Sequence, residues 1–139
     1  MNTTLFKTST RIAATIALAC LAGAALAQTT KVNVDAVANC ADLGGAGAVA
    51  PVYTDLVAGT YAIKVRSSTA TYCANGGCAH PTVAITIDDG VNYHTDTFEI
   101  SATKATNVTF GGAAHVWAYF IDTQCSDNAG KSVLQFTQH

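Results

Sequence analysis

Charged residues are scarce in this chain: Asp, Glu, Lys and Arg make up 12% of its 139 residues, against about a quarter in an average globular domain. The Lys- and Glu-rich pattern of helical bundles and coiled coils is therefore absent. Proline occurs only twice, and half of the residues are apolar, which argues against intrinsic disorder. The composition favours one small folded domain without long surface helices.

The chain also lacks an excess of basic residues. Lys7 and Arg11 belong to a segment that has the features of an export signal. Without them, five Lys and Arg residues stand against nine Asp and Glu residues, a net charge of −4. Proteins that bind nucleic acid carry basic patches that contact phosphates. We therefore expect no nucleic-acid partner.

Long apolar runs are missing after residue 27. Before that point, residues 1–11 contain two basic residues and residues 12–24 are apolar. Ala25-Leu26-Ala27 then forms a small-x-small cleavage site. No later run is long enough to span a bilayer. The sequence thus predicts a cleaved signal peptide at residues 1–27, a secreted or periplasmic domain at residues 28–139, and no membrane span.

The mature chain has an even number of cysteines: Cys40, Cys73, Cys78 and Cys125. An even count in an exported domain indicates disulfides, and four cysteines allow three pairings. Cys73 and Cys78 are the easiest to join, because the Asn-Gly-Gly sequence between them can form a tight turn. Cys40 would then pair with Cys125. A zinc site is the alternative, but a C-x4-C spacing is unusual for zinc and no second close pair exists.

Apolar and polar residues alternate along much of the mature chain. Period two is typical of strands with one buried face. Strands are predicted at residues 31–37, 59–66, 83–87, 98–100, 107–110 and 132–137. Residues 114–121 are apolar on both faces, which predicts a central strand. The pattern predicts an all-β fold: a single antiparallel β-sandwich, jelly-roll-like, with seven or eight short strands.

Two aromatic residues, Trp117 and Tyr119, belong to the predicted central strand. Their rings could stack on a sugar if they faced outward. On a strand that is apolar on both faces, packing inside the protein is the stronger expectation. We therefore predict that both rings belong to the core.

An oxygen-rich loop follows the central strand. Asp122 ends that strand, and Asp127-Asn128-Ala129-Gly130 leads into the last one. Calcium takes about six to eight oxygens from carboxylates, amides and backbone carbonyls, which Asp122, Asp127 and Asn128 could supply. The same residues also fit an ordinary hairpin turn, in which Asp and Asn cap backbone amides. The residues alone leave both interpretations open.

The order of these features resembles that of the calcium-dependent bacterial galactose-binding lectins. The matching pieces are the Cys73–Cys78 pair before a strand, the strand that ends in Asp122, and the Asp127-Asn128-Ala129-Gly130 turn before the last strand. This resemblance implies a small β-sandwich. It also implies that Asp122, Asp127 and Asn128 are calcium ligands and that sugar hydroxyls complete the coordination shell.

The motifs of common hydrolases are absent. There is no G-x-S-x-G nucleophile elbow, the cysteines are expected to be oxidised, and Glu99 is the only glutamate. We therefore expect no enzymatic activity. The predicted function is a secreted or periplasmic, lectin-like module that binds carbohydrate, with calcium as cofactor and glycans or cell-surface proteins as partners. The alternative is a disulfide-stabilised structural, adhesion or protein-interaction component without a small-molecule ligand.

Overall fold

The computed structural model describes residues 27–45, 50–73, 77–79, 82–90, 95–101 and 103–139. They form nine β-strands and one short 3-10 helix, η1. The elements are β1 (Thr29–Asp35), β2 (Cys40–Asp42), β3 (Val52–Leu56), β4 (Gly59–Ser68), β5 (Thr82–Asp88), β6 (Thr95–Ser101), β7 (Thr106–Phe110), β8 (Ala114–Asp122), η1 (Cys125–Asp127) and β9 (Lys131–Gln138). The predicted signal peptide lies outside the described residues, except for Ala27.

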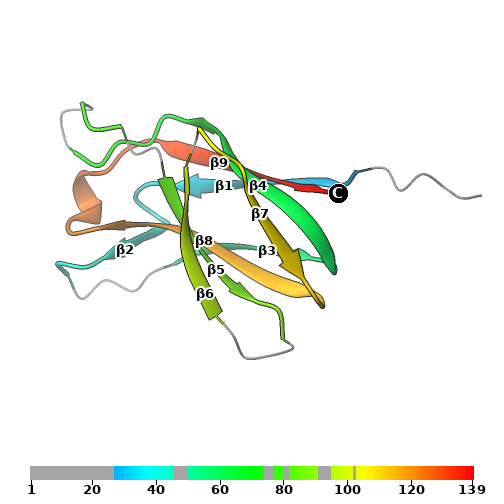
Figure 1. The fold of residues 1–139 in the computed structure, drawn as a ribbon. Coiled ribbons are helices and arrows are strands. Elements are labelled where there is room, and N and C mark those ends of the chain that lie inside the picture. The colour runs from blue at the N-terminus through cyan, green and yellow to red at the C-terminus, as the bar shows by residue number, and fades with distance from the viewer. Residues whose placement is uncertain (1–26, 46–49, 74–76, 80–81, 91–94, 102) are drawn as a thin grey trace, which may run out of the picture.

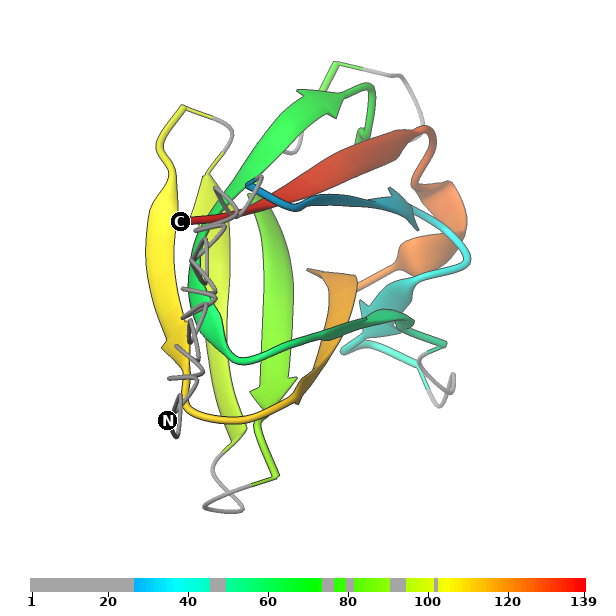
Figure 2. The ribbon, with the colours of Figure 1, turned by 90° about the vertical axis from the view of Figure 1, so that its right-hand side faces the viewer.

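The strands form two sheets that pack face to face (Figures 1 and 2). One sheet, here called the β9 sheet, has the order β1-β9-β4-β7. The other, here called the β8 sheet, has the order β2-β8-β5-β6, and β3 also pairs with β8. This arrangement confirms the predicted all-β sandwich.

Strand pairing follows the jelly-roll pattern. β1 pairs with β9, β3 with β8, β4 with β7 and β5 with β6, all antiparallel. Each strand of the first half thus pairs with the strand at the mirror position in the second half, as when a long hairpin is rolled up into two sheets. β2 is an addition to this pattern, because it pairs in parallel with the last three residues of β8.

The core lies between the two sheets and takes alternate residues from their strands. The largest fully buried side chains are Tyr61, Phe120, Phe136, Ile63, Ile85, Ile100 and Leu134. Tyr61 is buried as a whole but keeps its hydroxyl satisfied, because it donates a hydrogen bond of 3.1 Å to the carbonyl oxygen of Val57. The alternation predicted for residues 59–66, 83–87 and 132–137 is seen in the burial of these strands.

Two of the nine strands, β2 and β3, were not predicted. β2 has three residues, too few to show a period. β3 does not show the usual alternation of apolar inward and polar outward residues. Its aromatic residue Tyr53 points outward and is 64% exposed, whereas the polar Thr54 lies on the inward side between Val52 and Leu56. Both strands are recognisable only through their pairing with β8.

The prediction that Trp117 and Tyr119 belong to the core is wrong. On β8, Val116, Ala118 and Phe120 are buried against the β9 sheet, and the residues between them point away from it, only partly buried. β8 is central because it has neighbours on both edges, not because a third layer covers it. The outer face of the β8 sheet therefore carries aromatic rings.

Candidate functional site

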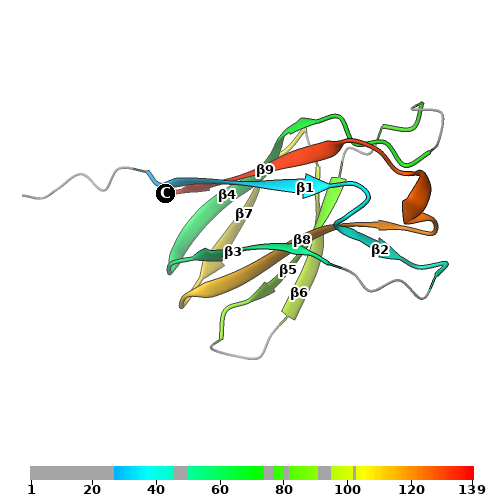
Figure 3. The ribbon, with the colours of Figure 1, turned by 180° about the vertical axis from the view of Figure 1, so that it is seen from behind.

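The predicted calcium ligands lie at one end of the sandwich, in the loop from β8 to β9 (Figure 3). β8 ends at Asp122, η1 follows, and β9 begins at Lys131. A disulfide between Cys40 and Cys125 links η1 to the start of β2, across a sequence separation of 85 residues. The loop is thus fixed covalently to the edge of the β8 sheet.

Asp122 uses only one of its two carboxylate oxygens. Its Oδ1 accepts hydrogen bonds from the backbone N–H of Thr123 at 2.6 Å and from the Thr123 hydroxyl at 3.5 Å. Its Oδ2 is buried and has no hydrogen-bond partner. The backbone carbonyl of Asp122 accepts from the N–H of Leu43 at 2.7 Å, which holds the end of β8 in place.

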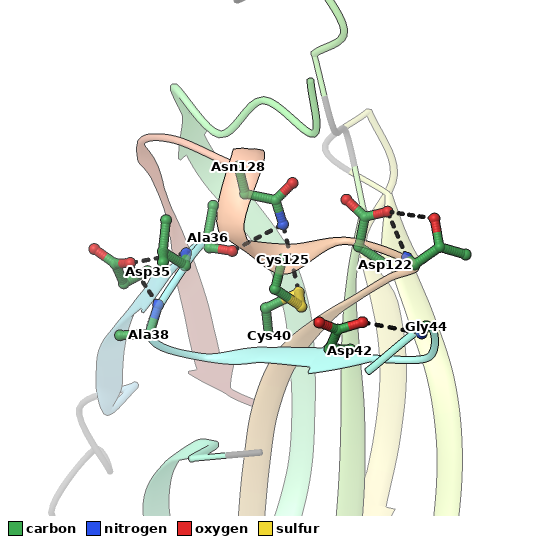
Figure 4. Close-up of a disulfide and its surroundings, with 11 residues drawn as sticks. Asp35, Ala36, Ala38, Cys40, Asp42, Gly44, Asp122, Cys125 and Asn128 are labelled. Atoms are coloured by element: carbon green, nitrogen blue, oxygen red, sulfur yellow. Dashed lines mark hydrogen bonds between the residues drawn. A yellow bond between two sulfur atoms is a disulfide. The ribbon is translucent and has the colours of Figure 1, made fainter. Parts of the chain in front are cut away.

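Asn128 is held so that its amide oxygen stays free. The residue is 7% exposed, and its Nδ2 donates to the carbonyl oxygen of Ala36 at 3.0 Å and to Sγ of Cys40 at 3.4 Å (Figure 4). Because both contacts require the amide nitrogen, they fix the orientation of the amide. Its Oδ1 is then buried without a partner.

Two further oxygens in this region also lack partners. Oδ1 of Asp127 is one of them. The other is Oγ1 of Thr71, which lies beside the loop because Thr71 and Ala129 exchange backbone hydrogen bonds of 2.9 and 3.1 Å. In the part of the chain that the structure describes, the only buried side-chain oxygens without a hydrogen bond are these four, and all belong to this end of the sandwich.

Such oxygens are rare in folded proteins, because each one left unpaired costs about 1–3 kcal/mol. Three of the four belong to Asp122, Asp127 and Asn128. The predicted ligands therefore belong to the loop that holds most of these unpaired oxygens. It does not bring their side chains into contact: in Figure 4, Asp122 and Asn128 lie apart, with Cys125 between them.

No three His, Cys, Asp or Glu side chains among the described residues are arranged to hold a metal. A cation at this loop would therefore need amide, hydroxyl or backbone oxygens beside its carboxylates, which is the ligand mixture of calcium sites.

A zinc site made of cysteines is excluded, because Cys40–Cys125 and Cys73–Cys78 are disulfides. Both predicted disulfide pairings are confirmed.

Asp42 is an acidic residue at this end of the sandwich that sequence reasoning missed. Parallel pairing of β2 with β8 places it opposite Asp122. Its Oδ1 accepts a hydrogen bond of 2.9 Å from the N–H of Gly44. No local pattern could have found it, since it reaches Asp122 only through a three-residue parallel strand.

The short disulfide lies next to the same end. Cys73 and Cys78 close a loop whose ends are also joined by a hydrogen bond of 3.0 Å from the N–H of Tyr72 to the carbonyl oxygen of Cys78. Thr71, which precedes this loop, bridges to Ala129 and to Ala79. The segment around Thr71 therefore connects the short disulfide to the β8–β9 loop.

No family model matches the chain, and neither a curated protein nor a solved structure matches it. Among the described residues, none of the helices has the length and apolar character needed to cross a membrane.

Proposed function

We propose that this protein is an exported carbohydrate-binding module whose β8–β9 loop binds calcium. One observation supports this most directly: Asp122, Asp127 and Asn128 each have a buried oxygen without a hydrogen-bond partner. These are the residues that the resemblance to calcium-dependent galactose-binding lectins implies as ligands. Two disulfides agree with an exported protein, because such bonds persist in oxidising compartments.

The residues at the loop fit calcium by their chemistry. Carboxylate oxygens of Asp122 and Asp127 and the amide oxygen of Asn128 are hard ligands, and the hydroxyl of Thr71 is a fourth. Calcium, when bound, would leave coordination positions for sugar hydroxyls. A sugar would therefore be recognised through its hydroxyl oxygens at the outer side of the loop.

The surrounding chain restricts the ligands before anything binds. Asn128 is oriented by its donor contacts to Ala36 and Cys40, and Asp122 is held by Thr123. The Cys40–Cys125 disulfide limits the movement of η1. Because Asp122 and Asn128 are held apart (Figure 4), the loop would have to move for both side chains to bind one ion.

A second candidate function is a protein-interaction or structural component without a small-molecule ligand. The outer face of the β8 sheet favours it, because Tyr53 is 64% exposed next to Trp117 on the neighbouring strand. Contiguous exposed apolar surface commonly marks a partner site. This candidate requires no calcium, which makes the two proposals separable.

Calcium is expected to stabilise the protein against heat. A ligand that binds only the folded state adds about 2.7 kcal/mol to the free energy of unfolding at about 100 times its Kd, which corresponds to a rise in Tm of about 10 °C for a domain of this size. Melting curves in calcium and in EDTA would measure this. Asp127→Asn, which keeps the shape of the side chain and removes its charge, should abolish most of the rise.

Asp55→Asn is the matched control, since Asp55 is exposed on β3, away from the loop. It should melt with the same calcium response as the native protein. If the native protein melted at the same temperature in calcium and in EDTA, the proposal that it binds calcium would be overturned. A glycan array in calcium and in EDTA then tests the sugar: calcium binding without any calcium-dependent glycan would support the second candidate function.

A further inference from the structure

The two sheets differ sharply in charge. The strands of the β9 sheet contain four basic residues and one acidic residue: Lys31, Lys64, Arg66, Lys131 and Asp35. The strands of the β8 sheet contain no Lys or Arg, and their acidic residues Asp55, Asp88 and Glu99 alternate with core residues and so point outward. The sheets lie on opposite sides of the sandwich (Figure 2). The domain therefore has a basic side and an acidic side.

The basic side is the outer face of the β9 sheet. Lys31, Gln135 and Lys64 lie in one row across β1, β9 and β4, and all three alternate with core residues, so they point outward. Arg66 is exposed two residues after Lys64 on β4, on the same face of the strand. Asp35, the acidic residue of this sheet, has an oxygen that accepts from two backbone N–H groups of the following turn.

The acidic side is the outer face of the β8 sheet. Asp55 on β3 and Glu99 on β6 are exposed at its two edges. Beside Asp55, Tyr53 of β3 is the cross-strand neighbour of Trp117 of β8, and His115 lies with its ring centroid 6.0 Å from that of Trp117. His115 is also paired with Asp55 at 2.5 Å. Aromatic rings flanked by carboxylates form a surface that attracts cationic groups.

We propose that the basic face of one copy docks on the acidic aromatic face of a second copy. The charges are complementary, and Lys and Arg side chains can lie over Trp117 and Tyr53 as well as reach Asp55 and Glu99. A glycan would use the rings but would leave the carboxylates and the segregation of basic residues without a role. A second copy of the chain uses both.

This contact is head-to-tail. Because the two faces lie on opposite sides of the sandwich, a docked pair keeps one free face of each kind, and further copies can add. The β8–β9 loops lie at the end of the sandwich and not on either face (Figure 3). An assembly would therefore present several loops together, which would raise the avidity of a weak sugar site. The assembly itself does not depend on calcium.

Sedimentation velocity of the mature protein at low and high salt tests the proposal. We expect species larger than a monomer at low ionic strength, and at least about tenfold weaker association near 1 M NaCl, where the Debye length falls to about 3 Å. EDTA and the Asp127→Asn variant should leave this behaviour unchanged. A monomer at low salt and at high protein concentration would overturn the proposal, whatever the calcium experiments show.

Charge reversal gives the sharper test. Lys64→Glu with Arg66→Glu should make the protein monomeric, because it replaces two positive charges of the basic face by negative ones. Asp55→Lys with Glu99→Lys should do the same by spoiling the acidic face. The first variant then has two acidic faces and the second has two basic faces, so each alone should stay monomeric and a mixture of the two should associate again.

A chain with all four reversals should associate again, because its two faces are complementary once more. This rescue cannot come from variants that simply fail to fold. Self-association of both reversed variants at the native level would overturn the proposal, and so would mixing without complex formation. A closed symmetric dimer in the native protein would also contradict it, because such a dimer joins like faces.

Discussion

Replacing Cys40 and Cys125 by alanine is expected to lower the free energy of unfolding by about 4.5 kcal/mol. The bond joins residues that are 85 apart in sequence, and cross-linking a loop of that length removes much conformational freedom from the unfolded chain. Total stability of a small domain is about 5–15 kcal/mol. The double variant should therefore unfold at much lower denaturant concentration, or fail to fold at 37 °C.

Chemical denaturation of the Cys73→Ala, Cys78→Ala double variant provides the control. Its bond closes a loop with a sequence separation of 5, for which the same relation gives about 2 kcal/mol. The long bridge should thus matter about twice as much as the short one. Equal losses for the two variants would show that loop length does not govern the effect of these bonds.

Gly130→Ala is expected to cost about 3 kcal/mol. Gly130 has φ +79°, where a side chain strains the backbone by about 1–2 kcal/mol. A Cβ there would also lie 2.2 Å from the carbonyl oxygen of Thr69 and 2.7 Å from its carbonyl carbon. Backbone atoms of a paired segment cannot move aside cheaply, so crowding adds to the strain.

Gly90→Ala separates the two causes. Gly90 has φ +65°, but among the described residues other than its chain neighbours no atom lies within 4 Å of where its Cβ would be. Its loss should be limited to the backbone strain of about 1–2 kcal/mol. Denaturant melts of both variants would measure the difference, and a Gly130 variant no less stable than the Gly90 variant would contradict the close approach of Thr69.

The Gly130 variant also connects stability to the proposed site. Gly130 follows the pair formed by Thr71 and Ala129, and its carbonyl oxygen accepts a hydrogen bond of 3.0 Å from the N–H of Ala36. Ala36 in turn accepts from the Asn128 side chain. A shift of the chain at Gly130 would therefore displace Asn128, and the calcium response should weaken together with the stability.

The sequence by itself determined the fold class and the cross-links. Alternation along strands such as residues 59–66 and 132–137 identifies which side chains are inward, because the pleat of a strand enforces period two. The cysteine pairing follows from an even count and one easily closed loop. The loop of Asp122, Asp127 and Asn128 was recognisable because its residue types are close together in the chain.

Tertiary structure alone decided which surfaces are covered. The sequence cannot tell a strand buried on both faces from a central strand of a two-layered sandwich, so Trp117 and Tyr119 were misplaced. Asp42 meets Asp122 only through the pairing of β2 with β8.

The separation of basic and acidic residues onto opposite sides likewise exists only once β4 and β9 lie in one sheet and β5 and β8 in the other. Local patterns reflect the geometry of a single strand. Neighbours across sheets depend on pairings between distant segments, which no local pattern encodes.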